Sequence, residues 1–313
     1  LYYAIFLAQA VTIRIFDLAM RLIGPILVFG GNALIVYMAY CYYFVVSPLL
    51  FERWTTPWFL MSLPGLWFVI NIIWNYVHCA FTPPGNPPLV EDEETLRAAR
   101  ARQPNPRAGE GFSRYCKKCR QPKPARAHHC HVCKKCVLMM DHHCPWMNNC
   151  IGYYNYRYFF MFLLYLWMGC FFSVLVSLKP FLATMYRKGE GRQLQVDRST
   201  RSAISFMFVL CLSIGIAVSI LLAWHIYLVL SAQTTIEFYY NRTRARRMRL
   251  RGQLHVNEYD LGMKRNFENI FGVGSLWCSW LLPSRQPPPG DGVSYPTCHS
   301  LYRPPAASHP HNV

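Results

Sequence analysis

Four long apolar stretches dominate the pattern of hydrophobic and polar positions along this chain of 313 residues. Each is long enough for a transmembrane helix, which needs about 20 mostly apolar residues to cross the hydrocarbon core. The stretches cover residues 22–46, 57–81, 158–178 and 204–230. Their pattern predicts a multi-pass α-helical membrane protein with four transmembrane helices joined by polar segments.

An apolar segment also precedes the first stretch, but charged residues interrupt it. Residues 1–21 contain Arg14, Asp17 and Arg21 among mostly apolar neighbours. This composition is typical of a helix that lies in the membrane interface. We therefore expect an N-terminal interfacial helix, and a truncated signal or anchor segment is the alternative interpretation.

Basic residues are distributed unevenly between the two sides that these spans define. The chain is 53% hydrophobic and carries a formal charge of +17. Of its 32 Lys and Arg residues, 25 lie in the N-terminal segment, in the loop 82–157 or in the C-terminal segment 231–313. The positive-inside rule places these three segments in the cytosol. The loop 179–203 is then lumenal, although its six basic residues oppose that orientation.

Most of the cysteines are concentrated in one part of the long cytosolic loop, within the segment 112–157. Seven of the thirteen fall between residues 116 and 150, several with the C-x2-C spacing of zinc sites. Few aliphatic residues accompany them, so bound metal must supply the folding energy of this small domain. Its seven cysteines and five histidines offer more candidates than the eight ligands of two zinc ions. Spacing alone does not choose among them.

The rest of the chain adds two observations. No internal repeat is evident along the sequence. The tail from Pro283 carries eight prolines, a composition typical of disordered segments, so we expect the end of the C-terminal segment to be disordered.

The cysteine-rich segment resembles that of one enzyme family. Residues 116–150 read C-x2-C-x9-H-C-x2-C-x2-C-x4-D-H-H-C-x5-C, the pattern of the DHHC protein S-acyltransferases. Thr234, Thr235 and Glu237 match the family's TTxE motif, and Asn266 stands at the asparagine of its C-terminal motif. The resemblance implies a palmitoyltransferase with four transmembrane helices and a cytosolic two-zinc domain.

A second set of residues is similar to one subgroup of that family. Thr82-Pro83-Pro84-Gly85, followed later by Lys123-Pro124-Ala125-Arg126, looks closest to the subgroup around the sixteenth human DHHC enzyme. That likeness implies membranes of the endoplasmic reticulum and the Golgi. It also implies two kinds of partner, namely membrane lipid and cytosolic or membrane proteins that carry juxtamembrane cysteines.

The resemblance implies how the metal ligands divide between two structural Zn²⁺ ions. The expected first site is Cys116, Cys119, His129 and Cys136, and the interleaved second site is Cys130, Cys133, His143 and Cys150. Cys144 then remains free of metal. The alternative is that Cys144 is a spare ligand in a purely structural zinc module.

A metal-free Cys144 is the expected nucleophile of the reaction. A thiol attacks a thioester well only if its pKa is lowered or a base lies beside it. His142 is the candidate base, and Asp141 would orient its ring and stabilise the imidazolium. The family's reaction moves a palmitoyl or longer acyl group from acyl-CoA through this thiol to a protein cysteine. The main alternative is a non-catalytic membrane scaffold. Nucleic acid is not an expected partner, since spanning segments bracket the module.

The co-substrate acyl-CoA needs a site for each of its ends. The resemblance places Lys123, Arg126 and His128 against the CoA phosphates, where charge-assisted bonds are effective. Ordinary surface charge is the alternative for each.

The acyl chain needs an apolar cavity among the spans. The resemblance implies that it is lined by Trp146, Phe159, Phe162 and Gly169, and plain helix packing is the alternative for each aromatic residue. Because Gly169 is small where a bulky residue would cap the cavity, we expect chains longer than palmitoyl to be accepted.

Overall fold

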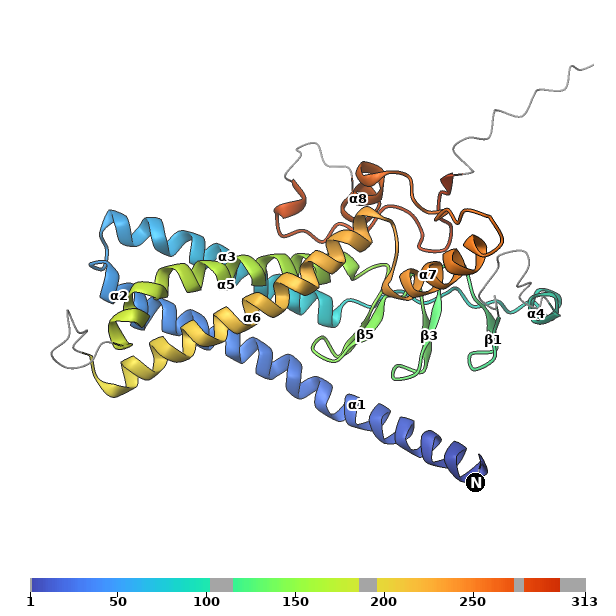
Figure 1. The fold of residues 1–313 in the computed structure, drawn as a ribbon, viewed down its shortest axis with the longest axis horizontal. Helices are drawn as coiled ribbons and strands as arrows, with labels where there is room; N and C mark the ends of the chain where they lie inside the picture. Colours follow the sequence, from blue (N-terminus) through green and yellow to red (C-terminus); the bar gives the residue numbers. More distant parts are fainter. Residues whose placement is uncertain (1, 102–114, 186–195, 273–278, 299–313) are drawn as a thin grey trace, which may run out of the picture.

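A computed structural model describes residues 2–101, 115–185, 196–272 and 279–298 of the chain. Four long helices form a bundle, and a small hairpin module and the C-terminal elements lie together at one end of it (Figure 1). Within the described residues, four helices are long and apolar enough to cross a membrane. The bundle contains α1 (Tyr2–Tyr40) with its continuation η1 (Cys41–Val46) and α2 (Ser47–Leu50), then α3 (Thr56–Phe81), α5 (Tyr156–Met185) and α6 (Arg198–Leu230).

The outer surface of the bundle is apolar, which is the arrangement that a bilayer requires. Large side chains such as Phe29 and Ile220 are each 72% exposed, although both lie on spanning helices. The inner surface is built around α5, which packs against both α3 and α6. Tyr165 and Leu163 of α5 are among its buried residues. Lipid therefore replaces water as the solvent of the outer faces.

Helix α1 differs from the expected N-terminal arrangement. The sequence predicts a separate interfacial segment before the first span, but α1 runs from Tyr2 through Pro25 to Tyr40 without a break. Two of its charged residues contact the hairpin module. Asp17 accepts a 2.7 Å hydrogen bond from Lys134, and Arg21 donates through Nε to the Val132 carbonyl at 2.9 Å. These contacts satisfy two of the polar groups that interrupt the apolar pattern.

The hairpin module consists of three antiparallel two-stranded hairpins in sequence order. The strands are β1 (Tyr115–Cys116) with β2 (Gln121–Pro122), β3 (His128–Cys130) with β4 (Lys135–Val137), and β5 (His142–Cys144) with β6 (Asn149–Ile151). Hairpins this short are not stable alone in water. Their stability must therefore come from bound metal and from docking onto the bundle.

The three hairpins form an internal repeat that the sequence analysis missed. Cys116, Cys130 and Cys144 lie fourteen residues apart, each at the end of the first strand of its hairpin. Each turn then contains a residue with positive φ at the same place, namely Arg120 (54°), Lys134 (57°) or Asn148 (47°). The repeat is short and its residues vary, so backbone pairing shows it more clearly than residue identity.

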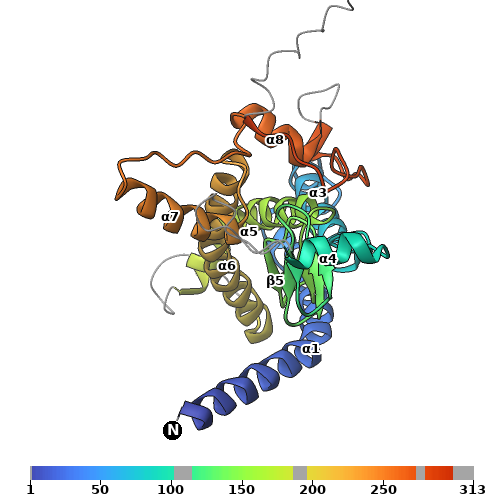
Figure 2. The ribbon, with the colours of Figure 1, turned by 90° about the vertical axis from the view of Figure 1, so that its right-hand side faces the viewer.

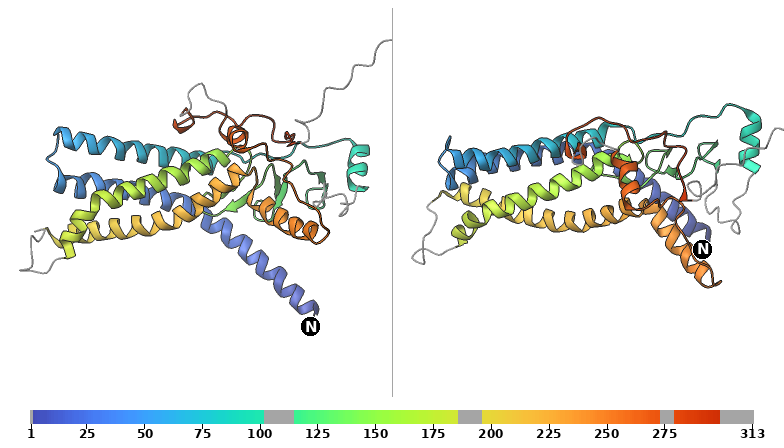
Figure 3. Two further views of the ribbon diagram at one scale, coloured as in Figure 1. Left: turned by 45° about the horizontal axis from the view of Figure 1, so that its top comes forward. Right: turned by 90° about the horizontal axis from the view of Figure 1, so that it is seen from above.

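The C-terminal elements cover the same end of the bundle as the module, as two further directions of view agree (Figures 2 and 3). They comprise α7 (Thr235–Arg249), α8 (Met263–Phe271) and η2 (Ser279–Leu281), while α4 (Glu93–Ala101) precedes the module. Within the tail from Pro283 that we expect to be disordered, residues 283–298 make hydrogen bonds to other parts of the chain. Tyr153 donates a hydrogen bond to the Pro289 carbonyl, and the Cys298 amide donates to the Glu258 carbonyl at 2.8 Å. Residues 299–313 lie outside the described part of the chain.

Candidate active site and metal centres

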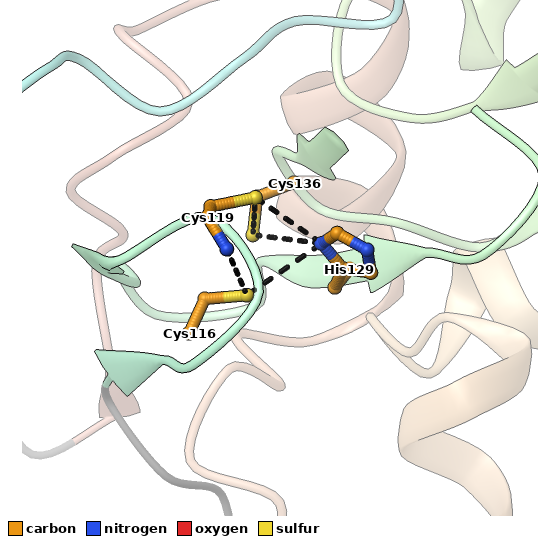
Figure 4. A group of neighbouring side chains, drawn as sticks. All are labelled: Cys116, Cys119, His129 and Cys136. Atoms are coloured by element: carbon orange, nitrogen blue, oxygen red, sulfur yellow. Dashed lines mark hydrogen bonds between the residues drawn. The ribbon is translucent and has the colours of Figure 1, made fainter. Parts of the chain in front are cut away.

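The first metal-binding cluster joins two neighbouring hairpins (Figure 4). Cys116 ends the first strand of the first hairpin and Cys119 lies in its turn, whereas His129 and Cys136 face each other across the second hairpin. The four ligand atoms lie within 4.8 Å of one another. His129 Nδ1 lies 3.2 Å from the Cys119 sulfur and 3.5 Å from the Cys116 sulfur. Three thiolates and one imidazole make a donor set that fits tetrahedral zinc.

The second cluster has the same arrangement of ligands, shifted by one hairpin along the chain. Cys130 and Cys133 belong to the second hairpin, and His143 and Cys150 pair across the third. Their ligand atoms also lie within 4.8 Å of one another, and His143 Nδ1 is 3.4 Å from the Cys133 sulfur. The residues of both clusters are the two sets that the family resemblance implied. The module therefore offers sites for two zinc ions.

The hairpin repeat explains why Cys144 belongs to neither of the clusters found among the described residues. Cys116 and Cys130 are each followed three positions later by a second cysteine, Cys119 or Cys133. After Cys144 the corresponding residue is Met147, which is 1% exposed and packs in the apolar core. The third turn therefore lacks the second thiolate of a zinc knuckle, and its cysteine is left without a metal partner.

Asp141 and His142 form a hydrogen-bonded pair beside this turn, and Cys144 follows His142 two positions later on the same strand, β5. Asp141 is 1% exposed and accepts from His142 Nδ1 at 2.7 Å. Burial by itself would raise the pKa of Asp141, but the hydrogen bond and positive charge of His142 outweigh it, so this pKa is lowered. The aspartate is therefore ionised at neutral pH.

His142 stands between that carboxylate and the thiol. Burial favours the neutral imidazole, but hydrogen bonds to Asp141 and Cys144 raise the pKa of His142 to about 9. An imidazole beside a cysteine sulfur is the arrangement in which a base can hold the thiol proton during nucleophilic attack. Phe159, 3% exposed, packs edge-on against the imidazole with ring centroids 5.2 Å apart. The arrangement can therefore support nucleophilic attack.

The residues of the TTxE motif, at the start of α7, also bind Asp141. The Thr235 amide donates to Asp141 Oδ1 at 2.7 Å, and the Thr235 hydroxyl donates to Oδ2 at 3.0 Å. Thr234 and Glu237 form a capping box, in which each residue's side chain accepts a hydrogen bond from the other's backbone amide. The N-terminus of α7 is thereby fixed against the Asp141 carboxylate. Asn266 of α8 donates to the Leu230 carbonyl at 2.8 Å and so ties α8 to the end of α6.

Arg126 has a partner that the sequence analysis did not foresee. Its guanidinium binds both oxygens of Glu237, with distances of 2.7 and 2.8 Å. Both side chains are 9% exposed. Burial alone would lower the pKa of Arg126, but Glu237 outweighs burial and raises it. The guanidinium is thus engaged within the protein, whereas the resemblance implied a contact with CoA phosphate.

Removing this guanidinium is expected to affect stability more than CoA affinity. Arg126→Ala leaves the Glu237 carboxylate buried without its cation and should destabilise the protein by about 3 kcal/mol. Thermal unfolding in detergent measures this loss. Arg97→Ala breaks an exposed ion pair with Glu93 and is the matched control, with an expected change below about 1 kcal/mol. A raised KM for palmitoyl-CoA at unchanged stability would instead support the CoA contact.

The expected contacts of Lys123 and His128 with the CoA phosphates remain predictions. His128 is half-buried, and burial together with Lys123 lowers the pKa of His128 to about 4 against the opposing effect of Glu237. It is therefore neutral at pH 7 and can offer an N–H group but no charge. Lys123 is half-buried.

The residues expected along the acyl chain occupy different environments. Trp146 is 60% exposed, whereas Phe162 stacks near Tyr76 with ring centroids 4.9 Å apart. Gly169 lines an apolar cavity of about 100 Å³ between the four long helices. Other lining residues include Ile35 of α1, Ile72 of α3, Cys170 of α5 and Ile214 of α6.

Two asparagines that the sequence analysis overlooked attach the third hairpin to the bundle. Asn149 donates to the carbonyls of Cys79, Ala80 and Thr82 at the end of α3, with distances from 2.9 to 3.2 Å. Asn155 is fully buried and donates to the Cys150 carbonyl at 2.8 Å. These bonds satisfy helix-terminal carbonyls that would otherwise lack partners. Nothing in the local pattern of the sequence indicated this role.

Comparison with known proteins decides the family. Residues 109–242 match the sequence model of the DHHC palmitoyltransferase family. Palmitoyltransferase ZDHHC16A of Danio rerio is 30% identical over 89% of this chain and 80% of its own length. The chain belongs to the DHHC palmitoyltransferase family. Palmitoyltransferase ZDHHC2 of Rattus norvegicus is 35% identical over 72% of this chain and 63% of its own. Probable protein S-acyltransferase 16 of Arabidopsis thaliana is 34% identical over 79% of this chain and 85% of its own.

Family membership confirms the predicted activity. The protein is a protein S-acyltransferase, with apolar helices that suit a membrane and two clusters that could hold zinc. The family membership supports this enzymatic function over the non-catalytic scaffold. When bound, zinc would supply folding energy to the hairpin module.

Proposed function

We propose that Cys144 carries the acyl group between acyl-CoA and a protein cysteine. In the first step the Cys144 thiolate attacks the thioester carbonyl, and the carbon–sulfur bond to CoA breaks. His142 holds the thiol proton and returns one to the departing CoA thiolate. In the second step a substrate thiol gives its proton to His142, its sulfur attacks the Cys144 thioester, and the bond to the Cys144 sulfur breaks to release the enzyme thiolate. Each step exchanges one thioester for another, so little free energy is lost.

The hydrogen bonds that link Thr235 to Asp141 and Asp141 to His142, with Cys144 two positions beyond His142 on strand β5, are the observation that carries this proposal. It places a base beside a thiol that belongs to neither cluster. Incubating the purified protein with palmitoyl-CoA and mapping the acyl adduct by mass spectrometry tests the assignment. A hydroxylamine-labile adduct on Cys144 is the expected result.

The proposed orientation places the hairpin module and both ends of the chain in the cytosol. There the thiol meets a water-soluble donor at one end of the bundle, while the acyl chain enters the apolar interior. Lys123 and His128 are the proposed contacts of the CoA phosphates. Membranes of the endoplasmic reticulum and the Golgi, and substrates with juxtamembrane cysteines, complete the proposal.

The cavity beside Gly169 is the proposed position of the distal acyl chain, and its volume should set the accepted chain length. A Cβ at Gly169 would lie 3.1 Å from Ile72 Cδ1. Gly169→Leu should therefore fill the cavity and lower the use of stearoyl-CoA relative to palmitoyl-CoA. Two buried methylenes correspond to roughly tenfold. Single-turnover acylation with both donors measures the ratio.

Gly30→Leu is the matched control for this experiment. Gly30 also lies in a spanning helix, but a Cβ there meets nothing within 4 Å. The donor ratio of this variant should equal that of the unchanged protein, which should use stearoyl-CoA well. Refusal of stearoyl-CoA by the unchanged protein would contradict the proposed cavity.

A further inference from the structure

The guanidinium of Arg126 lies against two tyrosine rings in addition to its partner Glu237. Its central carbon lies 4.7 Å from the ring centroid of Tyr259 and 5.0 Å from that of Tyr295. The two rings are 6.0 Å apart and inclined at 72° to each other. We call this pair the tyrosine clamp. Both tyrosines lie outside residues 109–242, the part of the chain that matches the family model.

Tyr295 reaches this position because residues 279–298, the C-terminal strap, fold back over the hairpin module (Figure 1). The strap turns sharply at Gly290 and Gly292, whose φ values are +102° and +72°. A Cβ at Gly292 would lie 2.7 Å from the ring of Tyr153, so this turn requires glycine both for its conformation and for its close approach. Asp291 Oδ1 accepts from the amides of Val293 and Ser294, both at 2.8 Å. The strap therefore contains a well-defined turn, which its glycines permit and the hydrogen bonds of Asp291 stabilise.

The clamp is connected to the catalytic carboxylate through a continuous set of contacts. Arg126 binds Glu237, and Glu237 Oε2 accepts from the Thr234 amide at 2.9 Å. The adjacent Thr235 donates twice to Asp141. The Arg126 backbone also participates, because its carbonyl accepts from the Met140 amide at 3.2 Å, one residue before Asp141. Displacement of Arg126 would thus disturb both attachments of the catalytic aspartate.

We propose that Tyr259 and Tyr295 are positioning residues for the acyl transfer, acting through Arg126 and Glu237 on Asp141. The faces of the two rings attract the cation, shield it from water and hold its plane in the orientation that binds both Glu237 oxygens. Without Tyr295 the guanidinium becomes hydrated on one side, and the N-terminus of α7 loosens from Asp141. This inference rests on the proposed roles of Asp141, His142 and Cys144.

Steady-state CoA release from palmitoyl-CoA, measured on the full chain in detergent, tests the clamp. Tyr295→Ala should lower kcat about three- to tenfold, the usual range for a shielded cation–π contact, with KM unchanged. Tyr295→Phe keeps the ring and should restore kcat. Tyr239→Ala is the matched control, because Tyr239 is 63% exposed on α7. A kcat of Tyr295→Ala equal to that of the unchanged protein, or of Tyr295→Phe as low as that of Tyr295→Ala, overturns the proposal.

A double-substitution experiment separates positioning from general stabilisation. In a Glu237→Gln background, Tyr295→Ala should cause no further loss of kcat, because the link through which it acts is already broken. The same fold-loss in both backgrounds overturns the proposal. If Tyr295→Ala fails to fold, Gly292→Val serves in its place, because it displaces the strap without removing either ring. Gly292→Val should lower kcat by the same factor. An unchanged kcat in Gly292→Val counts against the clamp. Cys144→Ser distinguishes a failed clamp from a failed nucleophile assignment, since it tests the latter alone.

Discussion

Cys144→Ser is expected to abolish the hydroxylamine-labile acyl label and to reduce CoA release from palmitoyl-CoA at least about a thousandfold, the scale seen when an enzyme nucleophile is removed. Serine is nearly isosteric with cysteine, but its hydroxyl is a far weaker nucleophile at neutral pH than a cysteine sulfur with a base beside it. Gel-based labelling with an alkyne analogue of palmitoyl-CoA and a CoA-release assay measure the two effects.

The control for this substitution is Cys298→Ser. Cys298 lies in the C-terminal strap, on the same end of the bundle, and is partly exposed. Its removal should leave both label and turnover unchanged. Full labelling of Cys144→Ser would refute the nucleophile assignment, and loss of label from Cys298→Ser would place a modified thiol in the strap.

Cys133→Ser is expected to release the zinc of the second cluster and to unfold the hairpins around it. Structural zinc contributes about 10–16 kcal/mol to the folding of small metal modules, far more than packing supplies in hairpins this short. Loss of the second cluster should also abolish acylation, because His143 lies between His142 and Cys144. Zinc per polypeptide, determined by elemental analysis, should fall from two to one, as one of the two clusters is broken.

Cys144→Ser is the matched control for metal content. It removes a thiol from the same module, and Cys144 belongs to neither cluster, so both ions should be retained. Loss of one zinc from Cys144→Ser would mean that this cysteine is a ligand, and the catalytic proposal would then fail. Hydrogen exchange of the hairpin amides distinguishes local unfolding in Cys133→Ser from general unfolding.

The repeat of hairpins connects these two predictions. The ligands of each cluster come from the turn of one hairpin and from facing positions on the next. A third hairpin supplies His143 and Cys150 and closes the series, but its own turn places Met147 where a second thiolate would stand. The backbone conformation that presents a possible zinc ligand in the first two hairpins therefore places Cys144 beside His142 in the third.

The sequence by itself determined those features that depend on neighbours along the chain. Transmembrane helices follow from runs of apolar residues, because every backbone group in such a helix is satisfied within the segment. The zinc ligands and the tetrad around Cys144 likewise recur at fixed short spacings. Those spacings were sufficient to indicate the family, which the comparison with known proteins confirmed.

Only the tertiary structure decided which distant residues became partners. Arg126 and Glu237 are separated by 111 positions, and the strap that supplies Tyr295 has a composition typical of disorder. A guanidinium is equally suited to phosphate, to a carboxylate or to an aromatic face, so residue type does not select among them. The choice depends on which groups the fold brings within reach and which of them lose their water, and both follow from the packing of the whole chain.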